Sequence, residues 1–251
     1  MPDPLLEVEG LSKRFGGLLA NQDVTFAIYP GEVVGLIGPN GAGKTTLFNC
    51  ITGFYRPDGG RVRFEGVDIT GWPPDKICRA GIARTFQVVR VFRGLTAFEN
   101  VMVGALLRHP NPSRAAEVAR KILDLTGLSA HADELVDGLP IALKKRVEMA
   151  RSLATGPKLL LLDEVMAGLN PRERQAAVEL VRRVRSELGV TVLMVEHVME
   201  VVMPLSDRVI VLDFGVKIAE GRPQEIINNP EVIKAYLGER YAARFGRLGG
   251  V

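Results

Sequence analysis

Residues 38–46 read GPNGAGKTT, and this stretch decides how the whole chain is interpreted. It fits the pattern G-x-x-x-x-G-K-[ST] and lies between an apolar run, VVGLI, and a helix-like segment, TTLFNCITG. In such a loop successive backbone N–H groups point inward at a helix N-terminus, where the helix dipole also favours a phosphate. The stretch therefore predicts a phosphate-binding loop that joins a buried strand to a helix.

The residue types of this loop suit separate tasks. Glycine is needed where the backbone takes positive φ or approaches a phosphate closely. The Lys44 ammonium can reach the terminal phosphates, and the Thr45 hydroxyl can ligate Mg²⁺. The predicted phosphate-binding residues are Gly38, Pro39, Asn40, Gly41, Ala42, Gly43, Lys44, Thr45 and Thr46.

A second feature is LLLLDEV, in which Asp163 and Glu164 end an apolar run. Ligands of open α/β sheets gather at the carboxyl ends of strands, so we expect these acids beside the phosphate loop. Asp163 suits the outer shell of Mg²⁺, and Glu164 suits a base that polarises an attacking water. Acids at strand ends also serve as helix caps, and it is the phosphate loop upstream that favours a functional role.

Two further polar residues follow apolar runs. His197 ends VTVLMVEH, where an imidazole can orient the water or contact the γ-phosphate, although a lone histidine is more often structural. Gln87, in GIARTFQ, carries an amide that can reach Mg²⁺ or the water. Neither residue is decisive by itself.

The order of apolar runs predicts an α/β fold. Short β-like runs in the first quarter indicate an antiparallel layer, and helical periodicity dominates from about residue 73 to 188. The runs KLLLLDE, VTVLMVE and DRVIVLD alternate with helical segments, as in a parallel sheet with crossovers. We expect one domain over residues 1–251, with a mixed sheet core, a helical subdomain at about 90–155 and a C-terminal helical tail at 222–251.

Composition sets limits on the partners. The 32 basic and 29 acidic residues are mixed along the chain, so the net charge of +3 indicates no nucleic-acid partner. Cys50 and Cys78 lack metal-site or disulfide spacing, which favours reduced thiols in a cytosolic protein. The N-terminus lacks the order of a signal peptide, and no run reaches the roughly 18 apolar residues of a membrane span. We expect any membrane attachment to be made through another chain.

Taken in order, GPNGAGKTT, RTFQ, LLLLDE, AGLNP and VEH resemble the motifs of ATP-binding-cassette (ABC) ATPases, over essentially the whole chain. The resemblance implies the ABC ATPase fold, with a RecA-like core, and the cofactors ATP and Mg²⁺. Residues 38–46 then match the Walker A loop, Gln87 the Q-loop glutamine, Asp163 and Glu164 the Walker B pair, and His197 the switch histidine. The catalytic residues implied are Glu164, His197 and Gln87, and the metal ligands are Thr45, Gln87 and Asp163.

The same resemblance assigns two more features. Residues 167–170 match the D-loop, and Phe15 matches the aromatic residue that stacks on adenine. On spacing alone, Phe15 suits a buried aromatic beside a turn equally well.

The segments GIARTFQVVRVFRGLTAFENVMVG and EGRPQEIINNPEVIKAYLGE are similar to the ATPase subunits of branched-chain amino-acid importers. That resemblance implies hydrolysis of ATP to energise uptake at the cytoplasmic face of the inner membrane. The implied partners are a second, different ATPase subunit, two membrane permease subunits and an extracytoplasmic binding protein. The family also transports urea, amides and aromatic acids, so the transported substrate stays open.

Residues 139–154, LPIALKKRVEMARSLA, depart from the family pattern. The family's LSGGQ segment, which contacts ATP held by the opposite subunit, falls on residues 139–143, where its serine, glycines and glutamine are absent. Pro140 suits the first position of a helix whose N–H groups can still face a phosphate. Lys144 and Lys145 either recover part of the lost interaction or form a solvated basic face. A partner subunit with an intact LSGGQ segment is therefore expected.

Two other classes stay open. One is a soluble ABC ATPase without a transport role, and the other is a regulatory subunit that binds nucleotide with weak or no hydrolysis. The end of the chain, with Arg240, Arg244 and Arg247, suits a frayed basic helix or a contact with a partner or with lipid headgroups.

Overall fold

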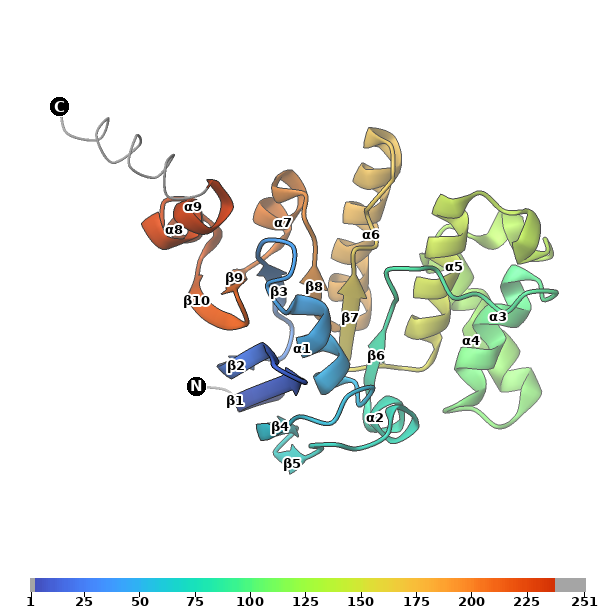
Figure 1. The fold of residues 1–251 in the computed structure, drawn as a ribbon. Coiled ribbons are helices and arrows are strands. Elements are labelled where there is room, and N and C mark those ends of the chain that lie inside the picture. Colours follow the sequence, from blue (N-terminus) through green and yellow to red (C-terminus); the bar gives the residue numbers. More distant parts are fainter. Residues whose placement is uncertain (1–2, 238–251) are drawn as a thin grey trace. The chain divides into compact units, whose positions relative to one another are not determined.

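The computed structural model describes residues 3–237. Contacts divide the chain into two compact units, one of residues 1–72 and 194–251 and the other of residues 73–193. Figure 1 colours the chain from blue at the N-terminus to red at the C-terminus. The Arg-rich end of the chain lies outside the described residues, and so does the last part of the tail predicted at 222–251.

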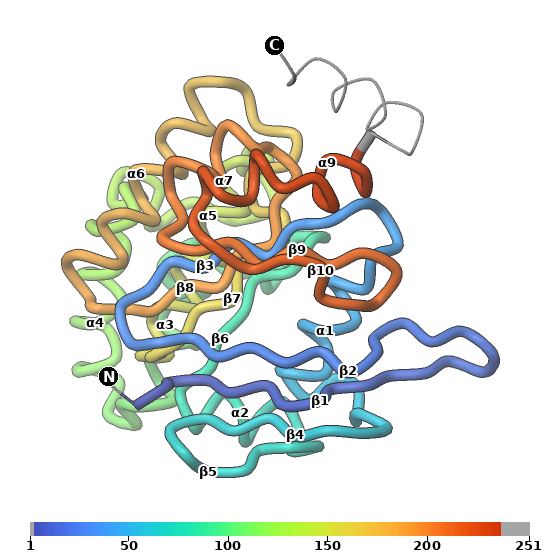
Figure 2. Tube along the Cα trace, turned by 90° about the vertical axis from the view of Figure 1, so that its left-hand side faces the viewer, coloured from blue at the N-terminus to red at the C-terminus, as the bar shows by residue number. Residues whose placement is uncertain are grey.

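The first unit contains an antiparallel sheet with the strand order β2-β1-β4-β5. Its strands are β1 (Leu6–Phe15), β2 (Leu18–Ile28), β4 (Gly59–Phe64) and β5 (Val67–Asp68). Leu6 and Val8 of β1 are buried while the residue between them is half-buried, because successive side chains of a strand point to opposite faces. Figure 2 shows β1 and β2 running side by side from one tight turn.

Three further strands of the first unit pair in mixed directions. Strand β3 (Val33–Ile37) runs parallel to β9 (Arg208–Asp213), and β10 (Val216–Gly221) runs antiparallel to β9. All five residues of β3 are buried, as expected for a strand covered on both faces. The helices of this unit are α1 (Lys44–Ile51), α7 (Met199–Leu205), α8 (Pro223–Ile227) and α9 (Pro230–Leu237).

The second unit is mainly helical. Its strands β6 (Ile82–Arg84) and β7 (Leu159–Asp163) pair in parallel, and β8 (Thr191–Val195) begins in this unit and ends in the other. The helices are α2 (Pro74–Ala80), α3 (Ala97–Leu106), α4 (Pro112–Leu125), α5 (Ile141–Ala154) and α6 (Pro171–Leu188), with the short 3-10 turns η1 (Ser129–His131) and η2 (Val136–Gly138).

Side-chain caps fix where two of these helices begin. Thr96 caps α3 and Asn170 caps α6, and in each case a glutamate three residues later returns a hydrogen bond to the cap backbone. Such reciprocal caps satisfy N–H groups that have no partner within the helix. They set the directions in which α3 and α6 leave their preceding loops.

The structure confirms the predicted mixed α/β fold with an antiparallel layer. Helices α3, α4 and α5 fall within the span of 90–155, where helical structure was expected, and Figure 1 shows them packed as one group. Between residues 3 and 237, every helix is too short or too polar to cross a membrane.

Helices α3 and α5 approach closely at Gly104. A Cβ atom at this position would lie far inside van der Waals distance of the Arg151 carbonyl oxygen, and 3.2 Å from the Cβ of Ala154. Only glycine leaves room for this backbone approach. The packing of α3 on α5 therefore depends on the missing side chain.

Replacing Gly104 by alanine should reduce the free energy of unfolding by about 1–3 kcal/mol, because α5 must move to admit the methyl group. Urea unfolding followed by circular dichroism measures the change. Gly138→Ala is the matched control in the same unit, since a Cβ there meets nothing within 4 Å. Equal losses for both variants would contradict the close approach as the cause.

Candidate functional site

The loop GPNGAGKTT joins β3 directly to α1 within the first unit. Gly43 caps α1 with φ of 97° and Gly38 has φ of 152°, both in the region that favours glycine. A Cβ at Gly38 would clash with the Leu212 carbonyl oxygen, and a Cβ at Gly43 with the Ala20 carbonyl oxygen. Glycine is therefore required at positions 38 and 43 for two reasons: the positive φ of the backbone, and the neighbouring carbonyl oxygens that leave no room for a side chain.

Lys44 and Thr45 open helix α1 in different surroundings. The Lys44 side chain is buried, and its Nζ donates to the carbonyl oxygens of Gly38 at 2.7 Å and Pro39 at 2.9 Å. Thr45 is exposed, and the first turn of α1 carries no acidic residue that would repel an anion. A helix N-terminus, an ammonium group and an exposed hydroxyl in one loop fit a Mg²⁺-bound nucleotide phosphate.

Phe15 lies at the end of β1 in the first unit with 42% of its surface exposed. The ring of Tyr55 meets it edge-on, with the centroids 5.2 Å apart, and Lys13 Nζ lies 5.4 Å from the Phe15 centroid. An exposed aromatic ring can stack on a base. Tyr55 could not be predicted from the sequence, because nothing in its spacing links it to Phe15.

Gln87 and Glu164, predicted on separate motifs of the second unit, lie in contact. The Gln87 Nε2 donates to Glu164 Oε2 at 2.8 Å. Glu164 has φ of 49°, an unusual conformation for a residue with a side chain, and such outliers are concentrated at functional sites. The two strand ends therefore place an amide against a carboxylate.

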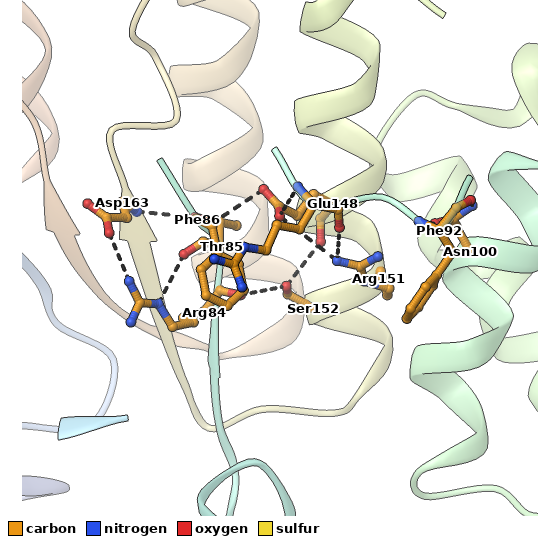
Figure 3. Close-up of polar contacts among 10 residues, drawn as sticks. Arg84, Thr85, Phe86, Phe92, Asn100, Glu148, Arg151, Ser152 and Asp163 are labelled. Atoms are coloured by element: carbon orange, nitrogen blue, oxygen red, sulfur yellow. Dashed lines mark hydrogen bonds and ion pairs between the residues drawn. The ribbon is translucent and has the colours of Figure 1, made fainter. Parts of the chain in front are cut away.

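Asp163 is buried beside a cation that the sequence pattern does not predict. The Arg84 Nη2 lies 2.9 Å from Asp163 Oδ2, and the Thr85 hydroxyl accepts from the Asp163 N–H at 3.1 Å (Figure 3). Burial lowers the pKa of Arg84, while the neighbouring Asp163 raises it. The only sequence signal for this pair is an arginine at the end of a short apolar run, which by itself is unremarkable.

The remaining predicted residues fall in the first unit. His197 is exposed and follows β8 by two residues. Lys44, Thr45 and Phe15 belong to the same unit, whereas Gln87, Asp163 and Glu164 belong to the second. Each unit thus carries a part of the predicted set.

Helix α5 begins one residue later than the sequence predicted. Pro140 is the N-cap, with φ of −56° and ψ of 154°, and Ile141 is the first helical residue and 56% exposed. Lys144 Nζ donates to the Asp137 carbonyl at 2.8 Å, and Lys145 Nζ donates to the carbonyls of Ala167 at 2.6 Å and Glu164 at 3.3 Å. Both lysines thus donate hydrogen bonds to backbone carbonyls of their own unit. This differs from both arrangements expected from the sequence, which were partial recovery of the lost interaction and a solvated basic face.

Among solved structures, the chain is similar to the ADP conformation of an ATP-binding cassette of an ABC transporter. The sequence identity is 34%, the TM-score is 0.85, and the match covers 94% of this chain and 100% of that one. The fold and the loop geometry thus define an ATP-binding cassette.

Sequence comparison narrows this class. A family model described as "ABC transporter" matches residues 21–167, and one described as "Branched-chain amino acid ATP-binding cassette transporter" matches residues 216–242. The chain is 45% identical to LivG of Escherichia coli K12 and 46% identical to BraF of Pseudomonas aeruginosa, over 95% of this chain and 100% of each relative. Both are named high-affinity branched-chain amino acid transport ATP-binding proteins. The chain belongs to the ABC transporter family, as the motifs predicted.

Replacing Arg84 by methionine should lower the free energy of unfolding by about 3–5 kcal/mol, because it removes the guanidinium that faces a buried carboxylate. Arg63→Met is the control, since Arg63 pairs with Glu9 at the same 2.9 Å while both side chains are partly exposed. For that pair we expect a change of about 0–1 kcal/mol. Chemical unfolding of the two variants measures the difference, and a small loss for Arg84→Met would contradict the importance of the buried pair.

Proposed function

We propose that this protein binds and hydrolyses ATP as the energising subunit of an importer for branched-chain amino acids or related compounds. The loop between β3 and α1, which combines a helix N-terminus with the Lys44 ammonium, carries the proposal. The substrate class is supported by the names of LivG and BraF and by the family match over residues 216–242. Amides and urea are the alternative transported substrates.

In the proposed reaction, the α1 N-terminus and Lys44 bind the phosphates and stabilise the negative charge that develops on them. Glu164 accepts a proton from the attacking water, and Gln87 orients that carboxylate through its bond of 2.8 Å. His197 contacts the γ-phosphate or the water. Phe15 stacks on the adenine.

Mg²⁺ would be held by Thr45 and Gln87, with Asp163 in its outer shell, and would neutralise charge on the phosphate oxygens. The outer position suits Asp163 because Arg84 already contacts its Oδ2 at 2.9 Å. Arg84 would also offset the negative charge of the buried carboxylate.

The proposed assembly contains two ATPase subunits, two membrane permease subunits and an extracytoplasmic binding protein. In this arrangement the protein is peripheral, at the cytoplasmic face of the inner membrane. ATP would bring the two ATPase subunits together, and hydrolysis would separate them.

Glu164→Gln should reduce the rate of ATP hydrolysis by about 10²–10⁴-fold, because the amide cannot accept the proton of the water. Binding of a fluorescent ATP analogue should be retained, since the phosphate loop is unchanged. Glu117→Gln, at a side chain that is 58% exposed, is the control. Undiminished phosphate release by Glu164→Gln in the assembled transporter would overturn the assignment.

We further propose that the two ATP sites of the assembly are unequal. The start of α5 presents Pro140 and Ile141 where the family has a serine and a glycine, and a lost hydrogen bond to a charged oxygen costs about 1.5–3 kcal/mol. The side chain of Ile141 also limits how closely the helix N-terminus approaches a phosphate. Because this segment would contact the nucleotide of the opposite subunit, the weakness falls on the partner's site.

A non-identical partner with an intact LSGGQ segment should therefore be required for full activity. Adding such a subunit to the purified protein should raise the rate of hydrolysis, and Glu164→Gln in this chain should abolish most of the gain. Rapid hydrolysis by the purified chain alone, lost on Glu164→Gln, would contradict the need for a different partner.

A further inference from the structure

The segment between β6 and α3 carries Gln87 on an exposed stretch of chain. Gln87 and Val88 are exposed, yet the backbone on both sides of them is bonded to buried side chains. These bonds come from helices α5 and α3, and Figure 3 shows the side chains converging on the segment. We call residues 84–92 the Gln87 segment.

Glu148 is the central contact. It lies on α5 with only 1% of its surface exposed, between the buried residues Val147 and Met149. Its Oε1 accepts the Arg90 N–H at 2.8 Å, and its Oε2 accepts the Phe86 N–H at 3.4 Å. One carboxylate thus binds the backbone on both sides of Gln87.

Burying a carboxylate costs free energy unless the carboxylate is hydrogen-bonded. Glu148 is nevertheless buried on a helix face that otherwise packs against the core. Burial raises the pKa of Glu148, and the N–H groups of Arg90 and Phe86 oppose that rise. The guanidinium groups of Arg151, Arg90 and Arg84 also act on this carboxylate. An apolar residue would fill the same space without this cost, but it would leave two backbone donors without an acceptor.

Neighbouring residues of α5 bind the same segment. The Ser152 hydroxyl lies 3.0 Å from both the Arg84 carbonyl and the Glu148 carbonyl of its own helix, so its single proton is shared between these two acceptors. An Arg151 Nη donates to the Arg90 carbonyl. The Arg151 guanidinium also lies over the ring of Phe92, 4.7 Å from its centroid. Three side chains within two turns of one helix therefore hold this segment.

Asn100 on α3 secures the far end. Its Oδ1 accepts the Phe92 N–H at 2.8 Å, and its Nδ2 donates to the Phe92 carbonyl at 3.1 Å. The backbone is thus bonded at residues 84, 86, 90 and 92, and Gln87 lies in the short span between two of these points. In that span the Gln87 amide meets Glu164 at 2.8 Å.

We propose that Glu148 is a positioning residue, which fixes the backbone on both sides of Gln87 and thereby holds the Gln87 amide against the Glu164 carboxylate. Ser152 supports the same anchor from the next turn of α5. Neither residue belongs to the predicted nucleotide-binding or catalytic set. The inference rests on the proposed ATPase function for its kinetic consequence, whereas the anchor itself can be tested without hydrolysis.

Glu148→Gln is the main test variant, because it keeps the shape of the side chain but replaces one acceptor oxygen by an NH₂ group that cannot accept. Amide hydrogen exchange in the full chain should become about 10-fold faster at Phe86 or Arg90, whichever N–H group faces the new NH₂ group. In the assembled transporter, kcat for ATP hydrolysis should fall by about 10-fold, since Gln87 is no longer held in place. KM for ATP should stay within about twofold, because the phosphate loop is untouched. Glu134→Gln, an exposed glutamate of the same unit, is the matched control.

Ser152→Ala is the second variant and removes one hydroxyl from the anchor. It should lower kcat by a smaller factor than Glu148→Gln does, and KM should again be retained. If Glu148→Gln does not fold, Ser152→Ala serves as the test of the proposal.

Faster exchange with unchanged kcat would overturn the proposal, and so would unchanged exchange at Phe86 and Arg90. A parallel loss of kcat, ATP affinity and melting temperature would show that Glu148 is merely structural. An inactive wild-type assembly would instead contradict the proposed ATPase function, and exchange would still report on the anchor.

Discussion

The first unit depends on close backbone packing around the phosphate loop. The carbonyl oxygens of Leu212 and Ala20 occupy the space that side chains at Gly38 and Gly43 would need. The turn after β9 adds to this packing, because the Gly215 N–H donates to the Ala42 carbonyl at 3.1 Å and the Gln22 N–H donates to the Gly215 carbonyl at 2.8 Å. Strand β2 and the β9–β10 turn thus fix the shape of the loop.

The second unit keeps charged groups in a mostly apolar interior. Asp163 faces Arg84, and Glu148 faces two backbone N–H groups, so each buried carboxylate has a donor close by. Both sets of contacts meet at the short strand β6 and the residues after it. The chemistry assigned to Gln87 and Glu164 is therefore supported by groups that need not touch substrate.

The sequence allowed prediction of the features that depend on local pattern. The loop at 38–46, the strand runs and the family resemblance follow from residue order, and the structure and comparisons confirm the fold and the family. The roles of Gln87, Glu164 and His197 stay predictions. Arg84, Glu148 and Asn100 could not be predicted, because each is a polar residue whose partner is distant in sequence and often a backbone atom. Helical periodicity places Glu148 on a face of α5, but it does not reveal which loop that face meets.

The bonds that hold the Gln87 segment are made almost entirely to backbone N–H and carbonyl groups. Such bonds do not depend on which side chains residues 88, 89 and 91 carry, and Val88 is 76% exposed. The outer surface of this segment can therefore be altered by substitution while the path of its backbone is kept. A few substitutions can thus change the surface that the cassette presents beside Gln87, with the position of its glutamine amide left as it is.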